Sequence, residues 1–495
     1  MERQVVSMKA VIIGGGLGGL SAAVHLASEG VDVKLFEKNS HFGGKMMAVD
    51  EEGYHFDFGP NTMTMPEVFT RVLSKAGLSP HLLDFEKIDT HTRNVFPNGT
   101  TFDFSTNQDV MKKQLKQLDP NGYQAYEPFL KEIERLYHMS RKHFLHRTFN
   151  GWKDYLSPAL MKSMINVRPL QSMDHFFRQY FTNPDIIQAL NRYSTYIGSN
   201  PYQAPATFSM IAHLEWNDGV YYVKGGNTKI AEAFVQAAEA AGVHLYSGTP
   251  VSKIHTYQGS AVGVETEDGD FFEADHVIVN GDLLQAVPEL INQKERKKMS
   301  DEKLASYDPS ISAFVIMAGL DTYLPQLHHH HLLFSGDYKK EFRQLSLGGY
   351  ADDPTIYICT SAKSDPDVSP KGDNCFILVN APAVGGHPQN KDHYKELIYD
   401  KLKKAGIPIS DHLVYEKVIG PEEIEAAFGA YRGSLYGPSS NSRSQAFMRP
   451  FNKSQDLKGL WFCGGSTHPG GGSPMVVLSG ENVANQIIGK IVHIE

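Results

Sequence analysis

Three glycines near the N-terminus have the spacing of a loop that binds a dinucleotide. Gly14, Gly16 and Gly19 form a G-x-G-x-x-G pattern that follows an apolar segment and precedes a segment of helical pattern. The first glycine allows a tight turn, the second lets the backbone approach a pyrophosphate, and the third permits close packing of helix on strand. The amides at the helix N-terminus favour negative phosphates. These residues therefore predict a binding site for a dinucleotide cofactor.

An acidic residue stands where such a cofactor places its ribose. Glu37 ends the second apolar segment of the same unit, and a carboxylate at this point accepts hydrogen bonds from ribose hydroxyls. The same negative charge disfavours a phosphorylated ribose. NADP is therefore excluded more firmly than NAD.

A strand, a helix and a second strand must position these residues. Residues 9–13 and 31–37 have the apolar pattern of buried strands, and a helix is expected between them. Residues 228–241 again predict a helix that short strands follow. Residues 459–464 predict a strand that runs into a second glycine-rich turn and a helix ending near Val492.

The chain changes in character between these blocks, since residues 107–217 are helical in pattern and residues 310–380 are strand-like. We interpret it as an α/β (α+β) protein with a discontinuous Rossmann-like domain and an inserted mixed substrate domain, because 495 residues suffice for about two domains. The cofactor-binding domain is assigned to residues 1–85, 220–300 and 455–495. The substrate-binding, membrane-facing domain is assigned to residues 86–219 and 301–454.

Composition excludes several classes of partner. The net charge of -9, with no run of Lys or Arg among aromatics, argues against nucleic acid. Cys359, Cys375 and Cys463 offer no CxxC spacing, which argues against a disulfide framework or a zinc site and predicts a reducing cytoplasm.

Residues 328–331 are four histidines, and we predict a solvated loop or strand edge because adjacent residues do not converge on one ion as i, i+4 histidines do. No metal is expected.

Membrane-spanning segments are not expected either. No stretch of about 18 apolar residues occurs, and the apolar run at residues 10–13 is too short for a signal-peptide core. The chain is expected not to cross a membrane, and peripheral attachment stays open.

Two further motifs identify the type of cofactor. Residues 41–45 (HFGGK), residues 57–60 (DFGP) and the glycine-rich residues 460–475 together resemble the flavin-containing amine oxidase and phytoene desaturase superfamily. This resemblance implies FAD, with amides of the second loop stabilising the charge of the reduced flavin. Lys45 stands where the family has Arg, which keeps the charge but loses the bidentate fork. The implied cofactor-binding residues are Gly14, Gly15, Gly16, Leu17, Gly18, Gly19, Glu37, Lys38, Gly43, Gly44, Lys45, Gly59, Pro60, Gly464, Gly465, Gly472, Pro474 and Met475.

Four segments narrow the resemblance to bacterial carotenoid oxidoreductases: residues 61–66 (NTMTMP), 196–205 (YIGSNPYQAP), 222–226 (YVKGG) and 468–475 (HPGGGSPM). Within that family the chain is most similar to the branch that oxidises a terminal methyl group of a C30 carotene to the aldehyde. The resemblance implies a lipophilic carotenoid substrate, with molecular oxygen as one candidate co-substrate. It also implies a cytoplasmic enzyme that lies peripherally on the inner face of the cell membrane.

Three other activities remain in view. A carotene desaturase begins with the same removal of hydride to FAD but then loses a proton, and an amine oxidase has the same fold. A non-catalytic prenyl carrier resembling the GDP-dissociation inhibitors is disfavoured by Glu37 and by the complete C-terminal glycine loop.

Residues that would contact the substrate are less sharply defined. We assign no catalytic residue, and for His468 we expect packing or flavin contact more than proton transfer. Residues 152–177, with Lys153, Lys162 and Arg168, predict a membrane-facing patch. Aromatic and methionine side chains are the candidates for the walls of a substrate tunnel, namely Met161, Met164, Met173, Phe176, Phe177, Tyr221 and Tyr222.

Overall fold

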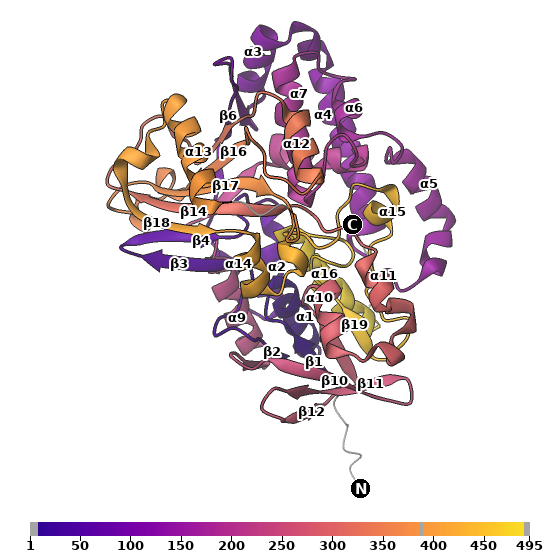
Figure 1. Cartoon of the computed structure of the whole chain (residues 1–495). Helices are drawn as coiled ribbons and strands as arrows, with labels where there is room; N and C mark the ends of the chain where they lie inside the picture. The colour runs from indigo at the N-terminus through magenta and orange to yellow at the C-terminus, as the bar shows by residue number, and fades with distance from the viewer. Residues whose placement is uncertain (1–7, 387–389, 490–495) are drawn as a thin grey trace.

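A parallel five-stranded sheet carries the N-terminal glycine motif in the computed structural model, which describes residues 8–386 and 390–489 (Figure 1). Its strand order is β19-β13-β1-β2-β9. The inner strands are apolar because both faces of the sheet are covered. The strands are β1 (Lys9–Ile13), β2 (Asp32–Phe36), β9 (His244–Tyr246), β13 (His276–Val279) and β19 (Leu460–Phe462).

Helices cover one face of this sheet, and a small antiparallel sheet with one helix covers the other. Gly18 and Gly480 let the first and last helices touch, because a Cβ on Gly480 would lie 2.1 Å from the carbonyl oxygen of Gly18. The first face holds α1 (Leu17–Ala27), α2 (Pro66–Lys75), α9 (Lys229–Ala240) and α16 (Ser473–Ile487). The second holds β10 (Val251–Tyr257), β11 (Ser260–Thr266), β12 (Phe271–Glu273) and α10 (Leu283–Leu290).

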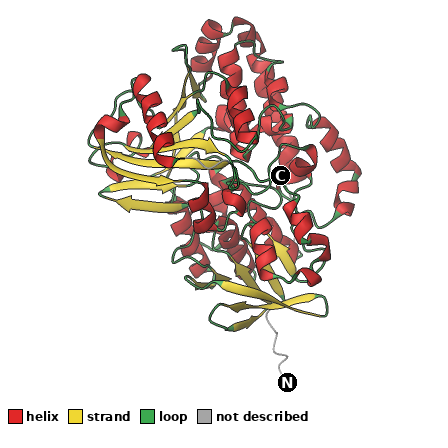
Figure 2. Ribbon diagram, viewed as in Figure 1, coloured by secondary structure: helices red, strands yellow, loops and turns green. Residues whose placement is uncertain are grey.

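A seven-stranded mixed sheet forms the second large layer, in the order β18-β14-β17-β16-β15-β6-β7 (Figure 2). All its pairs are antiparallel except β15 with β6. Alternate residues of β14 pack on α13 (Lys391–Lys404) and on β4, so this strand is buried along its whole length. The strands are β6 (Thr90–Val95), β7 (Thr101–Ser105), β14 (Ser312–Leu320), β15 (His330–Leu333), β16 (Ile356–Thr360), β17 (Asn374–Ala381) and β18 (Leu413–Ile419).

A helical layer packs on the far end of the mixed sheet around an aromatic core that includes Trp216 and Phe129. Its helices are α3 (Gln108–Leu118), α4 (Pro120–Ser140), α6 (Met173–Phe177), α7 (Pro184–Asn191), α8 (Ile211–His213) and α12 (Tyr338–Ser346), while α5 (Pro158–Asn166) lies at the edge of the molecule (Figure 1). The remaining elements are β3 (Met47–Glu51), β4 (Tyr54–Phe58), β5 (Phe85–Ile88), β8 (Val220–Val223), α11 (Asp301–Ala305), α14 (Pro421–Phe428) and α15 (Arg443–Phe447).

The predicted α/β fold is confirmed, and the helix expected over residues 228–241 is α9. The expected end of the last helix near Val492 lies outside the described residues. The division into two discontinuous domains stays a prediction. Within the described ranges, no helix is both long and apolar enough to cross a membrane.

The prediction for the four histidines is wrong. His329, His330 and His331 are buried, and His328 is half-buried. The reason is the position of β15, which pairs with β16 on one side and β6 on the other and is therefore an interior strand.

Candidate active site

Both glycine-rich loops open onto one cavity of about 700 Å³. The cavity begins at the carboxyl ends of β1 and β13, where Gly14 and Asn280 line it, and extends to the mixed sheet at Val315 and Leu378. Ligand sites in parallel sheets usually lie at this edge of the strands. Its size is that of a small-molecule site.

Two helix N-termini point their free amides at this cavity. Gly16 precedes α1 and Gly472 precedes α16, and neither helix has an acidic residue in its first turn or a side chain that caps its amides. Unpaired N–H groups and the helix dipole make such ends good sites for anions. A Cβ on Gly472 would meet only Met475 Cγ, at 3.9 Å, so this loop leaves room for a ligand to approach its backbone.

Glu37 holds the first loop in place from the end of β2. Its Oε2 accepts a hydrogen bond from the Gly15 amide at 2.7 Å, and its Oε1 accepts one from the Asn39 amide at 2.9 Å. The residue is 6% exposed and lines the cavity. Each carboxylate oxygen has a second lone pair, so Glu37 can still accept hydrogen bonds from a ribose.

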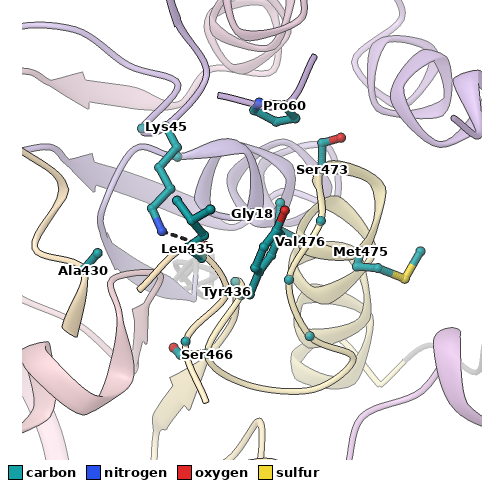
Figure 3. A pocket seen from close by; sticks show the side chains of 18 of the residues that line it. Gly18, Lys45, Pro60, Ala430, Leu435, Tyr436, Ser466, Ser473, Met475 and Val476 are labelled. Atoms are coloured by element: carbon teal, nitrogen blue, oxygen red, sulfur yellow. Dashed lines mark hydrogen bonds between the residues drawn. The ribbon is translucent and has the colours of Figure 1, made fainter. Parts of the chain in front are cut away.

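Most of the predicted cofactor-binding residues line this cavity. Gly15 and Gly19 do not: the amide of Gly15 serves Glu37, and a Cβ on Gly19 would lie 2.2 Å from the Gly14 carbonyl oxygen. The residues brought together are Gly14, Gly16, Leu17, Gly18, Glu37, Lys38, Gly43, Gly44, Lys45, Gly59, Pro60, Gly464, Gly465, Gly472, Pro474 and Met475. Figure 3 labels Gly18, Lys45, Pro60 and Met475 among them.

Sequence reasoning missed several lining residues. Asn280 and Asp282 follow β13, the neighbour of β1, and their place after an apolar strand was a usable signal. Arg449 and Tyr436 also line the cavity, and the Arg449 guanidinium donates to the carbonyl oxygens of Tyr436 and Gly465 at 2.8 and 2.9 Å. No sequence pattern marks these two residues.

A polar wall interrupts the otherwise apolar far part of the cavity. We use this name for Arg192, Tyr196 and Tyr357, which line the cavity, together with the fully buried Glu215 behind them. Glu215 accepts hydrogen bonds from the hydroxyl of Tyr196 and, at 3.4 Å, from the guanidinium of Arg192. Arg192 Nε is buried and has no partner among the described residues. The wall therefore retains an unsatisfied donor beside apolar surface.

Comparison with known proteins identifies the family. Residues 17–488 match the model of the flavin-containing amine oxidoreductases. The chain is 32% identical to a 4,4'-diaponeurosporene oxygenase of Staphylococcus haemolyticus, over 97% of each chain, and 31% identical to a 4,4'-diapolycopene oxygenase of a Methylomonas species, over 98% of this chain and 99% of the other. An oxidoreductase of Methanosarcina mazei has the same fold, with a TM-score of 0.62 at 17% identity and coverage of 98% and 100%.

The chain belongs to the flavin-containing amine oxidoreductase family. The protein is therefore an oxidoreductase that uses FAD, as the motifs predicted, and the resemblance to carotenoid oxidoreductases is confirmed. The residues present fit this cofactor: the α1 amides would hold its pyrophosphate and Glu37 its ribose. The loop before α16 would present amides to the flavin ring.

The ammonium group of Lys45 in this flavoprotein binds backbone carbonyl groups of the same chain. Its Nζ donates to the carbonyl oxygens of Ser434 and Leu435 at 3.1 and 2.8 Å (Figure 3). Burial lowers the pKa of Lys45 to about 8, although the charge of Asp282 opposes this shift. The lysine thus ties the segment at residues 41–45 to residues 434–435 at the cavity wall, a role that its single ammonium group fills without the fork of an arginine.

His468 packs against its surroundings, in agreement with the expectation. Its Nε2 lies 2.7 Å from the carbonyl oxygen of Phe144, and its ring meets Phe149 edge to face at 4.5 Å between centroids. Burial lowers the pKa of His468 to about 4, so the ring is neutral at pH 7.

The expected tunnel walls are wrong in detail. Met173, Phe176 and Phe177 are in the core of the helical layer, and Met161 is 52% exposed. None of the seven expected residues, including Met164, Tyr221 and Tyr222, lines the cavity. Apolar walls come instead from the end of α4 with the turn that follows it and from α8 with its flanking residues, through Tyr137, Phe144, Leu145, Phe208, Met210, Ile211 and Leu214.

A half-buried histidine in β4 makes stability depend on pH. His55 lies 2.7 Å from Asp50 and 3.3 Å from Asp57, which also accepts the Thr228 amide and thereby joins β4 to α9. Burial lowers the pKa of His55, but hydrogen bonds and charges of Asp57 and Asp50 outweigh it and raise the pKa to about 9.

We expect the free energy of unfolding to fall as pH rises from about 6.5 to 9. A raised folded pKa stabilises the protein fully below the unfolded value and no longer does so above the folded one, a loss of about 3 kcal/mol. Urea denaturation across this range measures it. His55→Asn should flatten the curve, whereas the exposed His81→Asn should not. If the free energy of unfolding of His55→Asn fell with pH as steeply as that of wild type, His55 would not be the group responsible.

Proposed function

We propose that this flavoenzyme oxidises the terminal methyl group of a C30 carotene to the aldehyde, with molecular oxygen as co-substrate. The observation that carries the proposal is the polar wall inside an apolar cavity continuous with the FAD loops. A purely hydrocarbon ligand would leave Arg192 Nε without a hydrogen-bond partner, which is costly in a buried site. An oxygen-bearing chain end would offer the Arg192 guanidinium an acceptor. The names of both oxygenase relatives agree with this assignment.

The protein's contribution is to hold and orient the substrate. Bound FAD supplies the acceptor for hydride. Tyr137, Leu145 and Leu214 give apolar surface for a polyene and exclude water from it. The polar wall would hold the end of the chain, and therefore favours a terminal carbon at the reacting position over an internal one.

The test is incubation with a fully desaturated C30 carotene. That substrate has no saturated bond left to dehydrogenate but keeps its terminal methyl groups, so mass analysis separates the two chemistries. We expect a product that has gained oxygen and contains an aldehyde. Inertness toward this substrate, together with dehydrogenation of more saturated precursors, would assign the enzyme as a desaturase.

We further propose that the enzyme binds the cytoplasmic face of the cell membrane through a patch on and around α5. We define the α5 patch as Trp152, Leu156, Met161, Ile165 and Leu170, which are 52 to 76% exposed. The exposed Lys153 and Lys162 lie among them and suit anionic lipid. Arg168, which was expected to contribute, pairs instead with Glu132 at 2.6 Å.

Replacing Leu156 and Ile165 with serine should weaken binding to anionic vesicles about tenfold or more, since each buried aliphatic side chain contributes about 1.5 to 3 kcal/mol. Both residues are at least 70% exposed, so the fold should be unaffected. Cosedimentation with liposomes measures the change. Leu347→Ser, at an equally exposed leucine outside the patch, is the matched control. Equal binding by the double variant and the control would refute the patch.

A further inference from the structure

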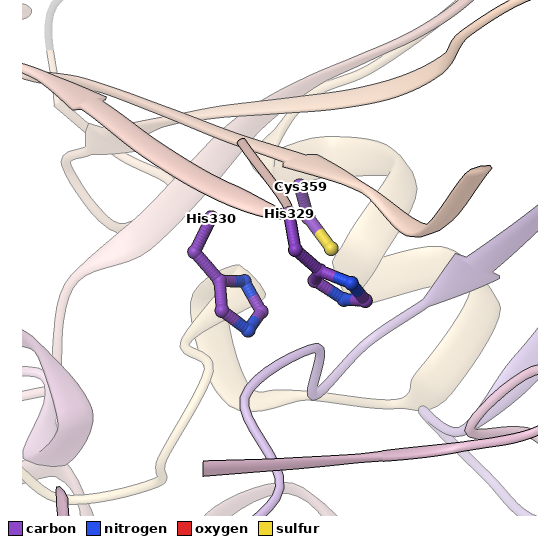
Figure 4. Close-up of side chains that lie close together, drawn as sticks. All are labelled: His329, His330 and Cys359. Atoms are coloured by element: carbon purple, nitrogen blue, oxygen red, sulfur yellow. The ribbon is translucent and has the colours of Figure 1, made fainter. Parts of the chain in front are cut away.

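Three side chains that can bind a metal ion meet in the interior of the mixed sheet, outside the FAD cavity. They belong to His329, His330 and Cys359, all of them buried, and their donor atoms lie within 4.8 Å of one another (Figure 4). His330 and Cys359 are cross-strand partners on β15 and β16. His329 precedes the first residue of β15, so its side chain need not point to the opposite face of the sheet from that of His330. The centroids of the two rings lie 4.5 Å apart.

Each imidazole is held by one nitrogen and leaves the other free. His329 Nδ1 lies 2.7 Å from the Ser364 hydroxyl, and His330 Nδ1 lies 2.9 Å from the Tyr357 hydroxyl. Nε2 of both rings is buried without a partner among the described residues. A metal-binding histidine has this arrangement, with its outer nitrogen fixed by a second group. Two buried nitrogens without partners, on rings 4.5 Å apart, call for an explanation, and a bound ion supplies one.

The protonation states suit a cation. Burial lowers the pKa of His329 to about 4 and lowers the pKa of His330 well below its ordinary value, so both rings are neutral at pH 7. Burial raises the pKa of the Cys359 thiol. An incoming ion would therefore replace the thiol proton, which leaves to solvent as the metal–sulfur bond forms.

We propose that His329, His330 and Cys359 bind a thiophilic d10 cation, Zn²⁺ or Cu⁺. Two imidazoles and a thiolate are ligands that both ions accept. Bonds of about 2.0 Å to nitrogen and 2.3 Å to sulfur place donors about 3.3 to 3.8 Å apart, so a cluster whose donor atoms lie within 4.8 Å of one another contracts by at most about 1.5 Å on binding the ion. The thiolate cancels the charge of Cu⁺ and half that of Zn²⁺, which reduces the cost of burying the ion near Arg192.

The role of this ion would be structural. It would join β15 to β16 directly behind Tyr357, the residue that the polar wall presents to the cavity. Through the His330 hydrogen bond, the ion would fix the orientation of the Tyr357 hydroxyl. The site does not depend on which carotene the enzyme oxidises.

The test uses the FAD-loaded full-length enzyme, produced in medium with added zinc, copper or cobalt. We expect about one equivalent of metal per chain by elemental analysis, and the better retained of zinc and copper identifies the ion. The cobalt form should show a thiolate-to-cobalt charge-transfer band. Wild-type protein that retains neither zinc nor copper, or a zinc-retaining enzyme whose cobalt form lacks that band, would overturn the proposal and assign the space to buried water only.

Two cysteine variants assign the ligand. Cys359→Ser should lose the metal and the charge-transfer band, whereas Cys375→Ser should keep both, because Cys375 is equally buried on the adjacent strand but outside the cluster. FAD content and a cooperative thermal transition establish that each variant is folded. Metal retained in full by folded Cys359→Ser would overturn the site. Should that variant not fold, the wild-type cobalt spectrum still decides.

Discussion

Replacing Glu37 with lysine should give a protein that no longer retains FAD through purification. The carboxylate now accepts two backbone amides, from Gly15 and Asn39, and the substitution removes both acceptors from a residue that is 6% exposed. It also places a cation where the ribose hydroxyls need an acceptor. Loss of one charged hydrogen bond costs about 1.5 to 3 kcal/mol, so a loss of 2 kcal/mol or more in FAD binding is expected. That corresponds to about 30-fold or more in Kd.

The measurement is the ratio of flavin to protein absorbance, followed by titration of the apoprotein with FAD. Glu37→Gln is the matched control, because the amide keeps the size of the side chain and one acceptor oxygen. It should bind FAD more weakly than wild type but more tightly than Glu37→Lys. Wild-type occupancy in Glu37→Lys would refute the role assigned to this residue.

The cofactor site could be predicted because its parts are local in the chain. Gly14, Gly16, Gly19 and Glu37 belong to one strand–helix–strand unit, so spacing alone specifies how they meet. The second loop, at residues 464–475, is likewise one turn before one helix. That this second loop meets the first could be predicted only from the family resemblance. β19, which leads into the second loop, pairs with β13 and not with β1, so no local spacing in the sequence relates the two loops.

The walls of the cavity could not be predicted, because long-range packing decides which face of a helix is buried. Residues 152–177 mix apolar and basic residues, and no local pattern separates Ile165, which is 76% exposed, from Phe176, which is in the core. The prediction that residues 328–331 form a solvated loop or a strand edge failed for a related reason. β15 is an interior strand through its pairing with β6, where His330 lies opposite Thr92, and no local pattern reports that contact. Nor does spacing reveal that Arg192 meets Glu215.

Replacing Arg192 with methionine should destabilise the protein by about 3 to 5 kcal/mol, because it leaves the fully buried Glu215 without its cationic partner. The double variant Arg192→Met with Glu215→Gln should recover most of this loss, since neither charge then remains buried alone. Urea denaturation measures both free energies of unfolding. Equal stability of the single variant and wild type would show that Arg192 does not compensate Glu215.

The double variant also separates stability from substrate recognition. It lacks the guanidinium donor that faces the cavity, and a lost hydrogen bond from a charged group weakens binding of an oxygen-bearing chain end by about tenfold or more. We therefore expect the folded double variant to release more alcohol and less aldehyde than wild type. Tyr193→Phe is the control, because the Tyr193 hydroxyl donates to Glu215 at 2.8 Å but does not line the cavity. An unchanged product ratio in the double variant would leave Arg192 a purely structural residue, because its charge would then stabilise Glu215 without contacting the substrate.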